Sequence, residues 1–93
     1  MRGKHLAQYR EIGRKIAFYR KLRNLSQEKL SEMIDKSRSY ISKIEAKNST
    51  MEFSLDILFD IADALHIDVA AFFNPIDVEI RSKYLKKEWH SLL

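Results

Sequence analysis

Polar and basic side chains share one face of a predicted helix in the middle of the chain. They are Arg38, Ser39, Ser42 and Lys43. Ile41 and Ile44 fall on the opposite face at helical spacing, which turns the polar set toward solvent. An arginine presents a fork of N–H donors that matches the O6 and N7 acceptors of guanine. The chemistry that these residues favour is hydrogen bonding to a partner.

Patterns typical of catalysis and metal binding are missing from the sequence. It contains no HExxH, no glycine-rich phosphate loop, no Ser/His/Asp set and no cysteine, and His5, His66 and His90 are scattered. Four aspartates recur at helical spacing, namely Asp56, Asp60, Asp63 and Asp68. Without a turn-type loop they make a poor cation cage, so we interpret them as a solvated face. We predict no enzymatic activity, no cofactor and no metal.

Charge is divided unevenly along the 93 residues. Residues 1–50 hold thirteen Lys and Arg against five Asp and Glu, a balance of +8. Residues 51–80 hold seven acids and no Lys or Arg, and residues 81–93 return to +3, which gives the net +4. Such polarity favours a polyanionic partner for the basic half, although basic residues can also simply solubilise a small domain.

Apolar periodicity predicts five short helices and no strand. The first runs from about Tyr9 to Arg23, with Ile12, Ile16 and Tyr19 facing inward. The predicted N-caps of the four later helices are Ser26, Ser37, Ser54 and Asp68. The inward residues of the second to fourth helices are Leu30, Met33, Ile34, Ile41, Ile44, Leu55, Leu58, Ile61, Ala62 and Leu65. With two glycines and one proline, the chain is predicted to be all-α.

The segment from Ser26 to Ala46 has the plan of a helix-turn-helix. A two-turn helix, a short break and a second helix of two to three turns follow one another. In this arrangement the first helix braces the second, which can place its N-terminal residues in the major groove of DNA. The polar face described above lies at the start of that second helix.

The residues also resemble a known family. Leu25-Ser26-Gln27-Glu28, Leu30-Ser31-Glu32 and the run from Ser37 to Glu45 are similar to the phage-repressor-like helix-turn-helix family of the xenobiotic response element (XRE) type. The similarity reaches back to Ile12-Gly13 and forward to Phe72, about two-thirds of the chain. It implies a five-helix domain, lambda-repressor-like in fold, that binds two-fold operators in double-stranded DNA as a homodimer.

The resemblance also implies roles for single residues. Arg38, Ser39 and Lys43 match positions that read base edges, on a recognition helix over about residues 37–46. The positions that it places at the DNA backbone are Gln27, Ser37, Tyr40, Ser42, Lys47 and Asn48. Gln27 would also brace the recognition helix. Arg20 and Glu45 match an ion pair between the first and third helices, which is structural.

The sequence departs from the family pattern in its turns. Asp35, Lys47 and His66 stand where the family commonly has glycine, and Lys36 replaces a small apolar residue. Asp and His are enriched among the residues that adopt positive φ, so Asp35 and His66 can substitute. We expect Asn48 to take the left-handed position in place of Lys47, and the Lys36 stem to lie along the surface.

Aromatic residues are abundant in the second half, where Phe53, Phe59, Phe72 and Phe73 exceed what a small core consumes. The resemblance implies dimerisation through the fourth and fifth helices, with Val69, Phe72 and Phe73 at the interface. The alternative is that all four phenylalanines fill the monomer's own core.

The chain divides into an arm over residues 1–8, a DNA-binding domain over 9–75 with the helix-turn-helix at 26–46, and a tail over 76–93. In the tail, Val78, Leu85, Trp89 and Leu92 form a helical stripe. It can fold back onto the extra apolar stripe of Phe18 and Leu22, or serve as a dimer arm.

We therefore expect a cytoplasmic, sequence-specific transcriptional regulator that lacks membrane segments. Two subtypes stay open, because the Arg38–Ser42 run is similar to restriction–modification controller proteins and antitoxin-type autorepressors share the same plan. The competing class is a protein-interaction module that uses the same scaffold without specific DNA binding. Whether the regulator also has a protein partner, such as a toxin or another regulator, stays open.

Overall fold

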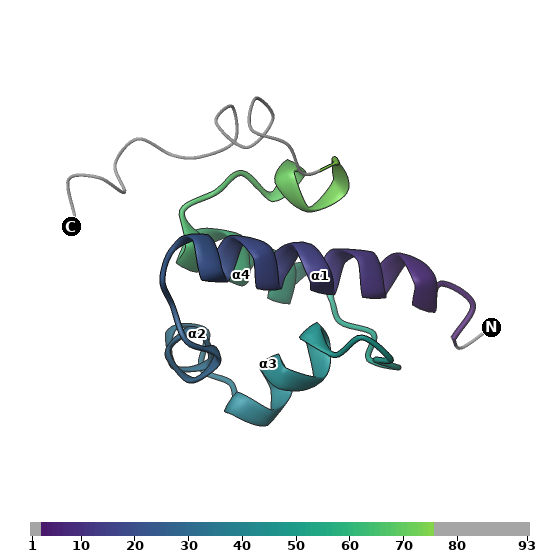
Figure 1. Cartoon of the computed structure of the whole chain (residues 1–93), viewed down its shortest axis with the longest axis horizontal. Helices are drawn as coiled ribbons and strands as arrows, with labels where there is room; N and C mark the ends of the chain where they lie inside the picture. The colour runs from purple at the N-terminus through teal and green to yellow at the C-terminus, as the bar shows by residue number, and fades with distance from the viewer. Residues whose placement is uncertain (1–2, 76–93) are drawn as a thin grey trace.

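The longest helix lies across the other elements (Figure 1). The computed structural model describes residues 3–75, in which the helices are α1 (Leu6–Leu22), α2 (Gln27–Met33), α3 (Arg38–Glu45), α4 (Leu55–Leu65) and the 3-10 helix η1 (Val69–Phe73). This range contains no strand ladder, so the all-α prediction is confirmed. None of its helices has the length and apolar character needed to cross a bilayer.

Two details of the predicted elements are wrong. The fifth helix is a single 3-10 segment of five residues rather than an α-helix. Helix α1 begins at Leu6 and not at Tyr9, so residues 6–8 belong to the helix and not to an arm. The early start follows from a turn in which Leu6 N donates to Gly3 O at 3.4 Å, while Gly3 N donates to the Glu52 carboxylate at 3.0 Å.

The four predicted N-caps are confirmed. Each side-chain oxygen accepts a backbone N–H from the first turn of its helix: Ser26 from Lys29, Ser37 from Tyr40, Ser54 from Ile57 and Asp68 from Ala70. A cap of this kind satisfies one of the orphan N–H groups of a helix start and contributes about 1 kcal/mol. The chain therefore marks the start of every helix after α1 with a local polar residue.

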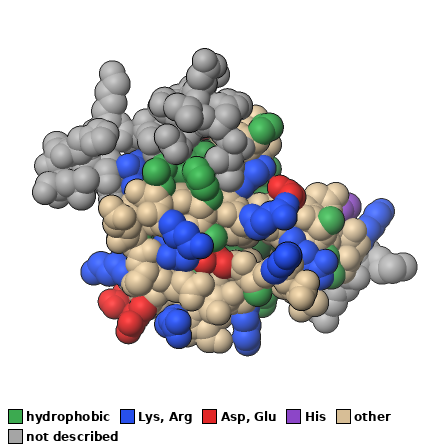
Figure 2. Space-filling view, viewed as in Figure 1, with side chains coloured by type: hydrophobic (Ala, Val, Ile, Leu, Met, Phe, Trp, Pro, Cys, Tyr) green, Lys and Arg blue, Asp and Glu red, His purple; other side chains and the backbone are tan. Residues whose placement is uncertain are grey.

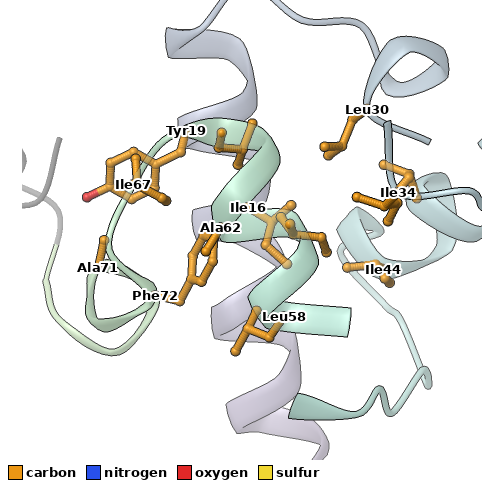
Figure 3. Close-up of a cluster of buried hydrophobic side chains, with 13 residues drawn as sticks. Ile16, Tyr19, Leu30, Ile34, Ile44, Leu58, Ala62, Ile67, Ala71 and Phe72 are labelled. Carbon is orange, nitrogen blue, oxygen red and sulfur yellow. The ribbon is translucent and has the colours of Figure 1, made fainter. Parts of the chain in front are cut away.

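One continuous core joins the helix-turn-helix to η1 (Figure 3). The buried apolar residues are Ile16, Tyr19, Leu30, Ile34, Ile41, Ile44, Leu58, Ile61, Ala62, Leu65, Ile67, Ala71 and Phe72. Figure 3 shows Ile16 and Ala62 in the middle, with Ile34 and Ile44 on one side and Phe72 on the other. The helix-turn-helix (α2 and α3) and η1 thus pack against the same two helices, α1 and α4.

Two residues predicted to face inward are exposed. Met33 is 45% exposed, because α2 turns Leu30, Ser31 and Ile34 inward instead. Ser31 is buried at no cost in hydrogen bonding, since its hydroxyl donates to Glu28 O at 2.6 Å. Leu55 is 56% exposed, because it lies in the first turn of α4 at the rim of the core.

Left-handed residues end or interrupt the helices at three places. Asp35 (φ 57°) and His66 (φ 54°) adopt the conformation predicted for them, and Asn24 (φ 58°) adopts it as well. The expectation for Asn48 is wrong, because its φ is not positive. Helix α3 ends instead in extended backbone at Ala46 (φ −63°, ψ 138°), so the following loop needs no left-handed cap.

Gly13 allows α1 and α3 to pack backbone against backbone. A Cβ at this position would overlap the carbonyl oxygen of Ile44, and it would lie 3.3 Å from the carbonyl carbon. Both obstacles are backbone atoms of α3, which cannot rotate away as a side chain would. The absence of a side chain at residue 13 therefore sets the distance between these helices.

We expect Gly13→Ala to destabilise the protein by about 1–3 kcal/mol, as overpacking typically does. At an exposed helical site the same change would stabilise by up to about 1 kcal/mol, because alanine has the higher helix propensity. Chemical denaturation of both proteins measures the difference. An increase in the free energy of unfolding would contradict the close approach.

Candidate nucleic-acid interface

The turn between α2 and α3 is fixed by backbone hydrogen bonds. Lys36 N donates to Ser31 O at 2.8 Å and Asp35 N to Glu32 O at 3.3 Å, with Asp35 in the left-handed region. Ser37 then begins α3 as its N-cap. This geometry holds the first turn of α3 at an angle to α2, the arrangement of a helix-turn-helix (Figure 1).

Helix α3 is divided lengthwise into a buried and an exposed face. Ile41 and Ile44 are 0% and 1% exposed. The exposed set is Arg38, Ser39, Ser42 and Lys43. The described part of the chain thus presents all three predicted base-reading residues, together with Ser42, on one open surface. A helix of this width fits the major groove of B-form DNA.

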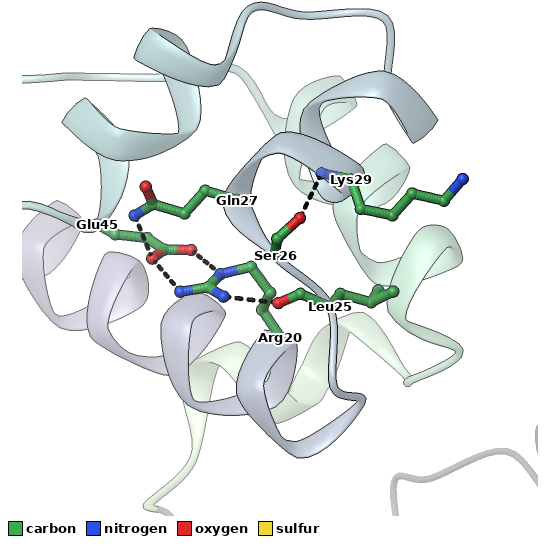
Figure 4. Close-up of polar contacts among 6 residues, drawn as sticks. All are labelled: Arg20, Leu25, Ser26, Gln27, Lys29 and Glu45. Carbon is green, nitrogen blue, oxygen red and sulfur yellow. Dashed lines mark hydrogen bonds and ion pairs between the residues drawn. The ribbon is translucent and has the colours of Figure 1, made fainter.

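An ion pair fastens α1 to the C-terminal end of α3 (Figure 4). Arg20 Nε donates to Glu45 Oε2 at 2.8 Å and Arg20 Nη2 to Glu45 Oε1 at 2.9 Å, which is the bidentate geometry of a strong pair. The two side chains are 9% and 6% exposed. The structural pair expected between Arg20 and Glu45 is therefore formed and almost fully desolvated.

The pair is extended by two further hydrogen bonds. Gln27 Nε2 donates to Glu45 Oε1 at 3.0 Å, and Arg20 Nη1 donates to Leu25 O at 2.7 Å. Figure 4 shows the three polar side chains converging from α1, α2 and α3. Gln27 thereby couples the start of α2 to the end of α3. Every element of the helix-turn-helix is tied to α1 through this cluster.

Tyr40 lies on the border between the exposed and buried faces of α3. It is half-buried against the core, and this burial raises the pKa of its hydroxyl above the ordinary value. The Lys36 ammonium lies 5.5 Å from the Tyr40 ring centroid. This contact explains how an exposed lysine is accommodated in the turn, because the cation is attracted to the face of the ring.

The loop after α3 holds two residues that were predicted to contact the DNA backbone. Lys47 and Asn48 are both exposed. The next residue, Ser49, is buried, and its carbonyl oxygen accepts a hydrogen bond from Arg10 Nε at 2.6 Å. Arg10 therefore anchors this loop to α1 and is not part of a solvated basic face.

Arg23 is a structural residue that the sequence did not reveal. It is 8% exposed, and it donates to Leu65 O at 2.8 Å and His66 O at 2.9 Å. Burial lowers the pKa of its guanidinium. The bonds satisfy carbonyl groups at the end of α4. Because its acceptors are backbone atoms more than forty residues away, no spacing pattern could indicate them.

Charge separates over the surface as it does along the sequence. Figure 2 shows Lys and Arg gathered over the side that α1 and α3 present to the viewer. All acidic residues between 51 and 75 are exposed, and they are Glu52, Asp56, Asp60, Asp63 and Asp68. Three of them, Asp56, Asp60 and Asp63, lie on α4 and give that helix an acidic outer surface, and Asp68 caps η1 three residues after its end.

One of the three predicted interface residues is a core residue. Phe72 is 0% exposed, and its ring meets the Tyr19 ring at 6.2 Å between centroids, so the prediction of an exposed Phe72 is wrong. Its position in η1 turns it inward with Ala71. Val69 is half-buried and Phe73 is 57% exposed. The tail stripe that includes Trp89 lies outside the described residues.

Comparison with known proteins agrees with this geometry. A helix-turn-helix family model matches residues 16–72, more than half of the chain, and the match spans α2, α3, α4 and most of η1. No curated protein matches the sequence. With its capped α2 and α3, the left-handed turn at Asp35 and the bracing pair beneath, the chain belongs to the XRE-type, phage-repressor-like helix-turn-helix family of DNA-binding regulators.

Proposed function

We propose that this protein is a sequence-specific transcriptional regulator that binds a two-fold DNA operator as a homodimer, with α3 in the major groove. The observation that carries the proposal is the exposed face of α3, where the side chains of Arg38, Ser39 and Lys43 lie outside the core on an N-capped helix. Arg38 would form a bidentate contact to a guanine, and Ser39 and Lys43 would read the neighbouring base pairs.

Contacts to the DNA backbone would fix the position of α3 along the major groove. Gln27 lies at the start of α2, and Ser37 lies at the start of α3, where N–H groups favour an anion. Ser42 and Tyr40 flank the reading residues, and the exposed Lys47 and Asn48 follow α3. The acidic surface of α4 would then face away from the phosphates.

The dimer would form through an apolar patch, which we define as Leu55, Phe59, Val69 and Phe73. Leu55 and Phe73 border one groove of about 320 Å³, and Phe59 and Val69 border a second of about 370 Å³. Three of the four residues are more than 40% exposed. Clustered exposed apolar residues are uncommon on small monomers and mark contact sites. A two-fold pair would set the recognition helices about 34 Å apart.

Retention on DNA tests the proposal against its competitor. We expect the protein to bind total genomic DNA at low salt and to keep a small set of fragments at moderate salt, since nonspecific phosphate contacts weaken steeply with salt. A protein-interaction module on this scaffold would release all DNA fragments at moderate salt, because it has no preferred sequence. The genes beside the retained fragments would distinguish a restriction–modification controller from an antitoxin-type autorepressor.

Arg38→Ala is expected to weaken binding to the selected site by about 1–3 kcal/mol while nonspecific binding hardly changes. Lys47→Ala serves as the matched control, because loss of a phosphate contact weakens all sequences about equally and lowers the salt slope by about one. Titrations of both variants on selected and scrambled DNA measure the two effects. Equal losses on both DNAs for Arg38→Ala would assign it to a phosphate instead.

A further inference from the structure

A groove with an apolar floor and a basic rim crosses the outer face of α1. Its volume is about 920 Å³. The floor is formed by Ala17, Phe18, Phe73 and Pro75, and the rim holds four bases, Arg14, Lys15, Lys21 and Lys47, beside two acids, Glu11 and Glu45. Phe18 is half-buried on α1, where it packs against the edge of the main core and meets the Tyr19 ring edge-to-face at 5.1 Å between centroids. The groove shares only Phe73 with the apolar patch, and the proposed DNA contacts of α3 do not account for it.

The chain itself leads into the groove. Pro75, the last residue that the structure describes, is part of the floor. Eighteen residues follow it. Even in helical form they would span about 27 Å, slightly more than the 17 residues of α1. The segment that follows Pro75 is therefore long enough to run the full length of the groove.

The apolar residues of the segment 76–93 suit the floor of the groove. Apolar residues recur along the segment, namely Ile76, Val78, Ile80, Tyr84, Leu85, Trp89, Leu92 and Leu93. The first charged residues after Pro75 are Asp77 and Glu79, which would meet the basic rim near its entrance. Charge therefore complements the rim over residues 76–80, which hold two acids and no Lys or Arg, while residues 81–93 carry +3 and would contact the groove through their apolar side chains.

We propose that residues 76–93 occupy this groove in the same molecule, with Trp89 covered by the outer face of α1. The groove is a docking site for the chain's own C-terminal segment, and its edge at Glu45 and Lys47 places that segment next to the end of the recognition helix. The inference does not depend on DNA binding, and either can fail without the other.

Trp89 is the sole tryptophan of the sequence, so its fluorescence in the full chain reports on docking directly. We expect blue-shifted emission and an acrylamide quenching constant several-fold below that of a synthetic peptide of residues 76–93. Phe18→Ser should move both values toward those of the peptide. Leu22→Ser is a second variant, because Leu22 follows Phe18 by one helical turn on the same side of α1, just beyond the groove, and its 37% exposure makes loss of core packing small.

Met33→Ser is the matched control. Met33 is 45% exposed and lies on α2, away from the groove, so this variant should keep the wild-type emission. Circular dichroism checks that each variant is folded. Quenching of the wild type equal to that of the peptide would overturn the proposal, and so would equal effects of Leu22→Ser and Met33→Ser. Emission that reddens on dilution of the protein would show that the segment docks on another molecule instead.

Discussion

Replacing Glu45 with alanine should lower the free energy of unfolding by roughly 3–5 kcal/mol, the range for breaking a buried ion pair from one side. The guanidinium of Arg20 is 9% exposed and would be left without its bidentate partner. Gln27 Nε2 would lose its acceptor in the same step. This loss is a large fraction of the stability of a small domain, so the variant should be partly unfolded at moderate temperature.

A double-mutant cycle separates the pair from its surroundings. We expect Arg20→Ala and Glu45→Ala together to cost less than the sum of the single changes, because the second removal leaves no uncompensated charge. Chemical denaturation of the four proteins gives the coupling. The surface pair of Glu11 and Arg14 is the matched control, since its side chains are 52% and 63% exposed and Glu11→Ala should cost at most about 1 kcal/mol. Additive losses for Arg20 and Glu45 would contradict the pairing.

The starts of the helices were predictable because their signals are local. Ser26, Ser37, Ser54 and Asp68 each bond to a backbone N–H two or three residues away, so the pattern contains both partners. The first turn of α1 was missed because its N-cap position, His5, makes no side-chain hydrogen bond. Its start depends instead on the tether between Gly3 and Glu52, residues 49 apart in sequence.

The inner faces of the helices were less predictable, because periodicity does not fix which of several apolar residues points inward. Met33 and Leu55 satisfy the spacing, yet α2 buries Ser31 and Ile34, and α4 begins its buried stripe at Leu58. The reverse holds for Phe72, which the family resemblance placed at a dimer interface and which the core buries. Tertiary packing against Tyr19 decides its position, and that contact spans more than fifty residues of sequence.

In the candidate interface too, features set within one helix could be predicted, and features set by distant contacts could not. The outward face of α3 could be predicted because it is the complement of Ile41 and Ile44 within one helix. Arg10 and Arg23 could not be separated by sequence from the basic residues around them. Both are committed to backbone carbonyl groups far along the chain, so they add to the positive charge of the sequence without being free for DNA.

Phe59→Asp is expected to give a folded monomer that has lost most of its operator affinity. Phe59 is 44% exposed on α4, so a carboxylate there keeps its hydration in the monomer but would be buried in a dimer. Each half-site alone offers few contacts, and losing the second one should weaken binding on the order of a hundredfold or more. Sedimentation and operator titration measure the two effects, with Met33→Ser as the equally exposed control. Phe73 is left unchanged, because it borders both the apolar patch and the groove on α1.

The acidic residues around the apolar patch predict that salt has opposite effects on dimerisation and on DNA binding. Asp63 and Asp68 border the same groove as Phe59 and Val69, and a two-fold interface would bring the acids of both copies together. Added salt screens this repulsion, so self-association should tighten as ionic strength rises, whereas binding to phosphates should weaken. Asp63→Asn should remove part of the salt dependence of the dimer and leave α4 folded, since Asp63 is exposed. A wild-type protein that sediments as a monomer at tens of micromolar, yet binds a two-fold operator tightly, would rule out this interface.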